Sequence, residues 1–240
     1  MSTEVTNWTD ELAKYAKVDA EKVTPSNSVI SLKAGVITYN GQPAPDNKLR
    51  AIVIGSASER AYYTDDYDPD NVASPLCWGL GGDGVDAPSE LAEEQQSDAC
   101  ATCPMNMWGS ATRGKGKACK ERVRVALIPA GLRTGEDVLK AEVAIMRVPV
   151  TSVKNWANYV ILVAHSKRRP TFAVVTEVST KPDPKSQFVV KFDYVEDVDV
   201  EQVPFLIEKR GMAMDVLMKP FEERQEQAPP PAAKGGKHRA

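Results

Sequence analysis

The sequence has few histidines and few cysteines, and it lacks any long apolar run. Only His165 and His238 occur among its 240 residues, which argues against sites that need a histidine beside a nucleophile or several histidines on a metal. No stretch approaches the roughly 20 apolar residues of a membrane-spanning helix. The segment Met1–Val5 has neither a basic region nor an apolar run. We therefore expect no membrane partner, no secretory signal and a reducing, cytoplasmic setting.

Catalytic motifs are also missing. The chain contains no HExxH, no GxSxG and no Walker A motif, and Gly114–Lys117 lacks the spacing of a phosphate-binding P-loop. A nuclease built on the carboxylates of Asp65–Asp70 and a divalent ion is the enzymatic alternative. Solvated acidic loops are common, so we expect a protein that is not an enzyme.

The four cysteines, in contrast, all fall within one glycine-rich stretch. They are Cys77, Cys100, Cys103 and Cys119, and the 121 residues that follow contain none. The CxxC spacing of the middle pair lets one metal ion bind both sulfurs from a single turn, and the two flanking thiols complete the S4 set that zinc accepts. Because four cysteines close the shell, we predict a structural zinc site rather than a catalytic one. Two disulfides, buried unpaired thiols and an iron–sulfur cluster are the alternatives.

Charge is divided sharply between two neighbouring segments. From Glu59 to Cys100 there are eleven acidic residues and one basic residue, Arg60, although the net charge of the whole chain is only −3. A basic block then follows, with one acid, Glu121, among Arg113, Lys115, Lys117, Lys120, Arg122 and Arg124. Glycines beside lysines allow the backbone to approach a phosphate. The block therefore predicts phosphate contacts, with a solvated loop as the alternative.

Hydrophobic periodicity predicts a mixture of strands and helices. An amphipathic helix is expected from about Thr9, with Trp8, Leu12, Tyr15 and Ala16 on one face. Strands are expected over Val29–Leu32, Val36–Tyr39, Leu49–Ile54 and Arg122–Ile128, the last with Arg122 and Arg124 facing outward. Residues 55–120 show little regular periodicity, and we expect the cysteines to hold this long segment together.

The second half of the chain has clearer signals. A strand is expected across Lys140–Val148, although Glu136–Ile145 is also compatible with a helical turn. A helix over Thr151–His165 precedes a hairpin formed by Phe172–Val178 and Gln187–Tyr194. A final helix, over about Asp199–Met218, is interrupted by Pro204 and Gly211. The chain after Pro220 has no core-forming residues, so we expect it to be disordered.

This order of elements predicts a β-rich α+β protein with an OB-fold-like five-stranded barrel and flanking helices. An OB-fold is a Greek-key barrel, commonly with a helix between its third and fourth strands. We expect a single domain over residues 1–220, a long metal-stapled loop inserted at about 60–120, and a disordered tail over 221–240. An α+β sandwich carrying a zinc ribbon is the alternative.

The cysteine segment resembles a group of tailed-bacteriophage proteins. The resemblance rests on Tyr67–Asn71, on Cys77, on Cys100–Ser110 with the pattern CxxCPxNxWGS, and on Gly114–Lys120 with the pattern GxGKxCK. It covers mostly residues 65–125. Some members are described as phage single-stranded-DNA-binding proteins, so the resemblance implies DNA binding in an infected bacterial host. The end of this chain, Lys237–Ala240, departs from the acidic tail with which many such binders recruit partners.

Sequence-neutral binding of single strands needs cations for the phosphates and aromatic faces for the bases. The stacking candidates are Trp108, Tyr62, Tyr63, Phe188, Phe192 and Tyr194, and core packing is the alternative for each. We predict a single-stranded-DNA-binding protein that acts in replication, recombination or transcription. The second hypothesis is a zinc-stapled interaction module that binds a phage or host polymerase through its acidic stretch.

Overall fold

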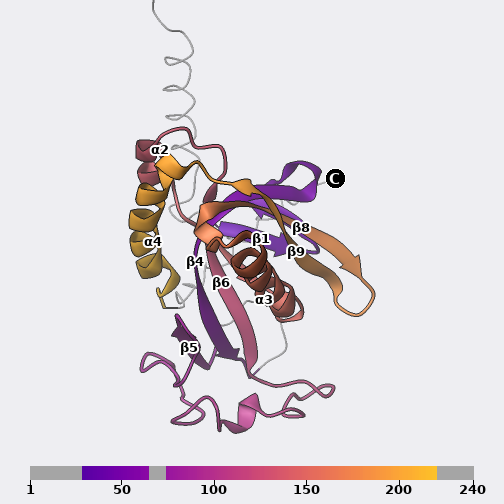
Figure 1. Ribbon diagram of the computed structural model, residues 1–240. Helices are drawn as coiled ribbons and strands as arrows, with labels where there is room; N and C mark the ends of the chain where they lie inside the picture. Colours follow the sequence, from indigo (N-terminus) through magenta and orange to yellow (C-terminus); the bar gives the residue numbers. More distant parts are fainter. Residues whose placement is uncertain (1–28, 65–73, 221–240) are drawn as a thin grey trace, which may run out of the picture. The chain divides into compact units, whose positions relative to one another are not determined.

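The computed structural model describes residues 29–64 and 74–220, which form two compact units (Figure 1). The first unit comprises residues 29–59, 80–85 and 121–218, and the second comprises 60–64, 74–79, 86–120 and 219–220. All four cysteines lie in the second unit. The helix expected from Thr9 and the tail over 221–240 lie outside the described residues.

A mixed sheet of nine strands is the main feature of the described chain. Its strands are β1 (Val29–Lys33), β2 (Val36–Tyr39), β3 (Gln42–Pro43), β4 (Lys48–Tyr62), β5 (Cys77–Gly81), β6 (Lys120–Pro129), β7 (Ala144–Val148), β8 (Val174–Asp183) and β9 (Gln187–Asp197). The order is β3-β2-β1-β7-β6-β4-β8-β9, with β5 also paired to β4. β1 and β7 run parallel. The sheet curls into a half-barrel, so the predicted β-rich class is confirmed.

Three α-helices accompany the sheet in the described residues: α2 (Gly135–Lys140), α3 (Val153–Leu162) and α4 (Val203–Leu217). Thr134 and Asp137 form a capping box at the start of α2, which satisfies amide groups that the first turn leaves unpaired. The last helix was expected over about Asp199–Met218, disturbed by Pro204 and Gly211. The residues before Pro204 form a 3₁₀ turn, Val200–Gln202, whereas α4 continues through Gly211 without a break. Pro204 lies in the first turn of α4, where the backbone N–H that proline lacks would have no helical partner.

Two apolar cores lie on opposite faces of the central strands. Trp156 and Tyr159 of α3, together with Val163 just after this helix, pack with the inner face of the half-barrel. Val138 of α2 and Leu206 of α4 pack with the other face, together with further residues of α4. Residues 51–55 of β4 are therefore buried on both faces, which explains why they form a continuous apolar run rather than an alternating one.

Strand boundaries differ from the sequence-based ones in two places. β4 continues past Ile54 as far as Tyr62, because residues 57, 59 and 61 alternate as buried positions with more exposed neighbours. The two alternatives for residues 136–148 each hold in part: α2 ends at Lys140 and β7 begins at Ala144. The predicted hairpin is confirmed and is longer than expected, from Val174 to Asp197.

A cluster of polar contacts joins the β1–β2 hairpin to β8. The Asn47 side chain donates to the Gly35 carbonyl (2.8 Å) and to the Thr180 hydroxyl (2.6 Å), and it accepts from the Ile37 amide (2.7 Å). Thr180 also donates to the Gly35 carbonyl. Asn47 and Thr180 thus join the β1–β2 hairpin to β8.

Candidate thiol cavity and basic finger

The second unit brings all four cysteines around one small cavity. Cys77 starts β5, Cys100 and Cys103 lie on a tight turn, and Cys119 immediately precedes β6. All four line a cavity of about 20 Å³, together with Arg60 and Tyr62 of β4. A space of this size holds about one water-sized occupant.

Backbone hydrogen bonds fix the segments that carry these cysteines. The Cys100 amide donates to the Asp86 carbonyl (2.8 Å), and the Cys119 amide donates to the Met105 carbonyl (2.8 Å). The Asn106 side chain donates to the Cys100 carbonyl (2.8 Å). The thiols therefore sit on a hydrogen-bonded frame although the segment contains little regular secondary structure.

All four cysteines are free thiols rather than disulfides. Burial raises the pKa of Cys119 to about 11, and the three neighbouring cysteines add to this rise. Burial also raises the pKa of Cys100, whereas a hydrogen bond from Arg60 opposes that rise. In the described residues no three Cys, His, Asp or Glu side chains are arranged as a metal site, so ligation requires the thiols to turn toward a common centre. The donor set and the room suit one zinc ion.

Next to the cavity, residues 105–119 form a loop that we call the basic finger. The amides of Gly109 (3.0 Å) and Ala111 (3.1 Å) both donate to the Gly116 carbonyl, which closes the loop. The Ser110 hydroxyl lies 2.9 Å from the Met105 carbonyl and accepts from the Ala118 amide at 2.9 Å. Gly109 (φ 87°) and Gly114 (φ 79°) adopt left-handed backbone conformations that favour glycine.

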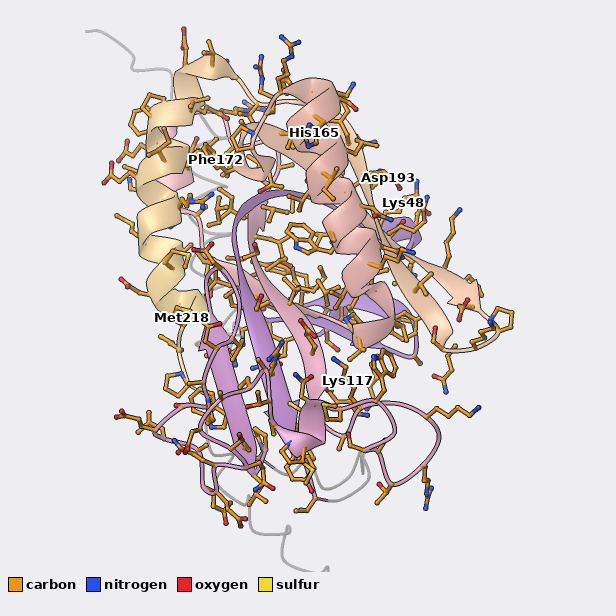
Figure 2. All side chains as sticks on the ribbon, turned by 60° about the horizontal axis from the view of Figure 1, so that its bottom comes forward. Lys48, Lys117, His165, Phe172, Asp193 and Met218 are labelled. Carbon is orange, nitrogen blue, oxygen red and sulfur yellow. The ribbon has the colours of Figure 1, made fainter. Side chains whose placement is uncertain are left out.

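The finger presents an aromatic ring and several cations. Trp108 is 80% exposed, and the Lys117 ammonium lies 5.6 Å from the centre of its ring. Lys117 is also held at 3.0 Å from the Asn106 amide oxygen, and Figure 2 labels its side chain. Arg113 and Lys115 are exposed near the tip, between Ala111 and Gly116. The structure thus brings Trp108 and Lys117 together, with the ammonium over one face of the indole ring.

Two predicted binding residues are buried instead. Arg124 was expected to face outward from its strand, but it is only 3% exposed because it pairs with the fully buried Glu59. Its guanidinium also donates to the Leu217 carbonyl at 3.1 Å. Phe192 is 7% exposed and packs edge-on against Trp156 at 5.1 Å between ring centres. Neither residue is available at the surface: the outward orientation expected for Arg124 was wrong, and for Phe192 the alternative, core packing, holds.

The remaining candidates are partly accessible. Phe188 packs against the first core, and its side chain lies close to Gly35. The Tyr194 ring has the Lys167 ammonium 4.1 Å from its centre, so a base would compete with that cation for the ring face. Tyr62 lines the thiol cavity, while Tyr63, Lys120 and Arg122 are half-buried. The Lys120 ammonium donates to the Lys117 carbonyl at 2.6 Å and thereby helps to fix the end of the finger.

Sequence reasoning missed Arg60, which lines the cavity beside the thiols. A signal for it existed, because Arg60 is the only basic residue between Glu59 and Cys100. It also missed the buried Glu59–Arg124 ion pair, since neither residue carries a local signal of burial.

Comparisons with models of protein families, with curated proteins and with solved structures found no match. None of the helices in the described part of the chain combines the length and the apolarity needed to cross a bilayer.

Proposed function

We propose that this chain is a bacteriophage single-stranded-DNA-binding protein that uses the basic finger as its main contact surface. The observation that carries the proposal is an indole ring, Trp108, exposed to 80% on a hydrogen-bonded loop. Arg113 and Lys115 are exposed on the same loop, and Lys117 lies beside the ring. Bases stack on such a ring whatever their identity, and the cations neutralise phosphates, so binding is sequence-neutral.

We further propose that the first unit is an OB-fold with an added N-terminal meander. In an OB-fold the first strand lies between the second and the fourth, the third pairs with the second, and the fifth pairs with the fourth. Taking β4, β6, β7, β8 and β9 as these strands reproduces each of these pairings, and α3 falls between the third and fourth. The arrangement departs from an OB-fold at the edge of β7 that faces away from β6, because β1 pairs with β7 there.

This assignment gives the cysteine segment a functional position. The loop between the first and second strands of an OB-fold is one of the two loops that commonly contact nucleic acid, and the loop between the fourth and fifth is the other. The segment between β4 and β6 carries the basic finger, and the β8–β9 turn carries the exposed Lys181 and Lys185. Each of these loops therefore carries exposed cations.

The cysteines complete the proposal as a structural zinc site. The ion would be held by Cys77, Cys100, Cys103 and Cys119. It would act as a structural crosslink between these segments and would take part in no reaction. Because Cys119 ends the finger and Cys103 precedes it, ligation would pin both of its ends. The protein would then act without catalysis, in replication, recombination or transcription in the cytoplasm of the infected host.

Fluorescence anisotropy with labelled oligo-dT and a matched duplex tests this function. We expect the single strand to bind more tightly than the duplex. Affinity for the single strand should fall with salt at a log–log slope of about −2, since each of three neutralised phosphates contributes about 0.7. No binding to oligo-dT even at low salt would refute the proposal.

One observation favours the second hypothesis, a module that binds a phage or host polymerase. Leu91 is 71% exposed and is surrounded in sequence by Glu90, Glu93 and Glu94, a combination suited to a basic protein surface with an apolar pocket. The second hypothesis would be supported if the protein does not bind oligo-dT but does bind purified polymerase, and if Leu91→Asp abolishes the polymerase binding.

A further inference from the structure

The first unit contains an apolar groove whose lining includes none of the residues of the proposed DNA surface. Its volume is about 360 Å³, and it runs between α3 and the strands β4 and β6. The walls are Val153, Trp156, Ala157, Val160 and Ile161 of α3, with Ser56, Ala57, Ser58, Gly82 and Val123 opposite. In Figure 1, α3 lies beside β6, with β4 on the other side of β6.

The surface next to this groove is also apolar. Ile161 is 56% exposed and Leu162 is 49% exposed, both near the end of α3, and Val150 just before the helix is 48% exposed. Single exposed apolar residues are ordinary, but Ile161 is also part of the groove wall, and exposed apolar surface that adjoins an apolar groove is typical of a binding surface. None of the residues that line the groove in the described part of the chain is charged.

We propose that the groove is the docking site of this chain's own N-terminal segment, residues 5–16. The pattern of this segment places Trp8, Leu12, Tyr15 and Ala16 on one face of a helix, with Asp10 and Lys17 opposite. Such a helix is marginal alone and needs an apolar partner. The Trp8 indole N–H and the Tyr15 hydroxyl require hydrogen-bond partners when buried, and the hydroxyls of Ser56 and Ser58 in the groove wall are suitable.

The connecting chain is long enough to reach. Val29 pairs with Ile145 of β7, and Ile145 pairs with Ala126 of β6, so Val29 and Ala126 are two strand spacings apart, about 10 Å. Val123 of the groove lies three residues along β6 from Ala126, about 10 Å further in the perpendicular direction. The separation from Val29 to the groove is therefore about 14 Å. Residues 17–28 can span up to about 40 Å when extended.

Tethering also makes weak docking sufficient. A short flexible linker gives an effective concentration in the millimolar range. A helix whose affinity for the groove as a free peptide was only about 1 mM would then be docked for a substantial part of the time. An occupant from another molecule would need far higher affinity at ordinary protein concentrations, which favours the chain's own segment.

Hydrogen–deuterium exchange of the full-length protein tests the proposal. We expect the amides of residues 8–16 to exchange at least about tenfold more slowly than in a free peptide of residues 1–28. Leu12→Glu and, independently, Ile161→Glu should abolish this protection, whereas Lys17→Glu, on the opposite helix face, should leave it. Because Ile161 is more than half exposed, its replacement should not unfold the protein, and thermal melting checks this.

Three results would overturn the proposal. The first is exchange of residues 8–16 at the rate of the free peptide. The second is protection that persists in a folded Ile161→Glu variant, since the segment would then dock elsewhere. The third is protection that disappears on dilution, because the occupant of the groove would then come from a second copy of the chain.

Discussion

An exposed indole on an ordered loop keeps a large apolar surface in water, and Trp108 does so without burial by any neighbour in the described chain. Stacking of one base on such a ring contributes about 1–3 kcal/mol. Trp108→Ala should therefore lower the affinity for oligo-dT by about 5- to 150-fold, with the salt slope nearly unchanged. Isothermal titration at several salt concentrations measures both quantities. Met107→Ala, which removes an exposed but non-aromatic neighbour, is the matched control and should have little effect.

Glu59 pairs with two arginines that differ in burial, so replacing each arginine in turn compares the contributions of a buried and an exposed ion pair to stability. Arg124 (3% exposed) and Arg147 (46% exposed) both pair with the same fully buried carboxylate. Losing the buried partner leaves an uncompensated charge and costs about 3–5 kcal/mol, while losing the exposed one costs about 0–1 kcal/mol. Urea denaturation of Arg124→Met and Arg147→Met should separate them in this order. Equal losses would mean that the burial of Arg124 does not govern the pair.

At the scale of elements, the basic finger is expected to act as a phosphate clamp. Lys115→Ala with Lys117→Ala should reduce the log–log salt slope for oligo-dT by about 1.4, because two phosphate contacts are lost. Lys140→Ala with Lys154→Ala, which removes two lysines of α2 and α3, is the matched control and should leave the slope unchanged. Anisotropy titrations over a range of salt concentrations give the slopes. A slope that changes equally in both double variants would remove the finger from the binding surface.

The Asn47 side chain makes three hydrogen bonds, two to the β1–β2 hairpin and one to β8. Asn47 has φ 55°, a conformation that glycine tolerates, so Asn47→Gly removes its three hydrogen bonds without adding backbone strain at that residue. Each lost bond contributes about 0.5–1.5 kcal/mol, and we expect a total loss of about 2–3 kcal/mol in urea denaturation. The control is Asn158→Ala on the exposed face of α3. Alanine is used there because glycine would itself destabilise the helix. A loss no larger than that of the control would show that the hairpins are held by other contacts.

Elements with strong local signals were predicted well. The β8–β9 hairpin is marked by apolar runs on either side of Lys181–Lys185, and α3 by Trp156 and Val160 at helical spacing. β4 was cut short at Ile54 because Gly55, Ser56 and Ser58 carry no strand signal, although tertiary packing keeps them in the sheet. The burial of Arg124 could not be read from an alternating strand, because alternation does not tell which face a partner such as Glu59 will cover.

At the scale of the whole molecule, the clustering of the cysteines was visible in the sequence and their common cavity agrees with it. Their metal stays a prediction. Protein purified under reducing conditions should contain one zinc per chain, and Cys103→Ser should lower this content. Because ligation and folding of such a loop are linked, chelation should increase hydrogen exchange over residues 74–120 before it affects β8 and β9. Protein without zinc or iron, or a chelator that loosens both units together, would contradict the metal site.

The most direct test of the central claim, a single strand stacked on the finger, is the quenching of tryptophan fluorescence by oligo-dT. Among the described tryptophans, Trp78 and Trp156 are 8% and 6% exposed, whereas Trp108 is 80% exposed. Saturating oligo-dT should therefore quench the wild-type protein, and Trp108→Phe should lose most of this quenching while it still binds. Equal quenching in the wild type and in Trp108→Phe, or none in either despite binding, would contradict the account.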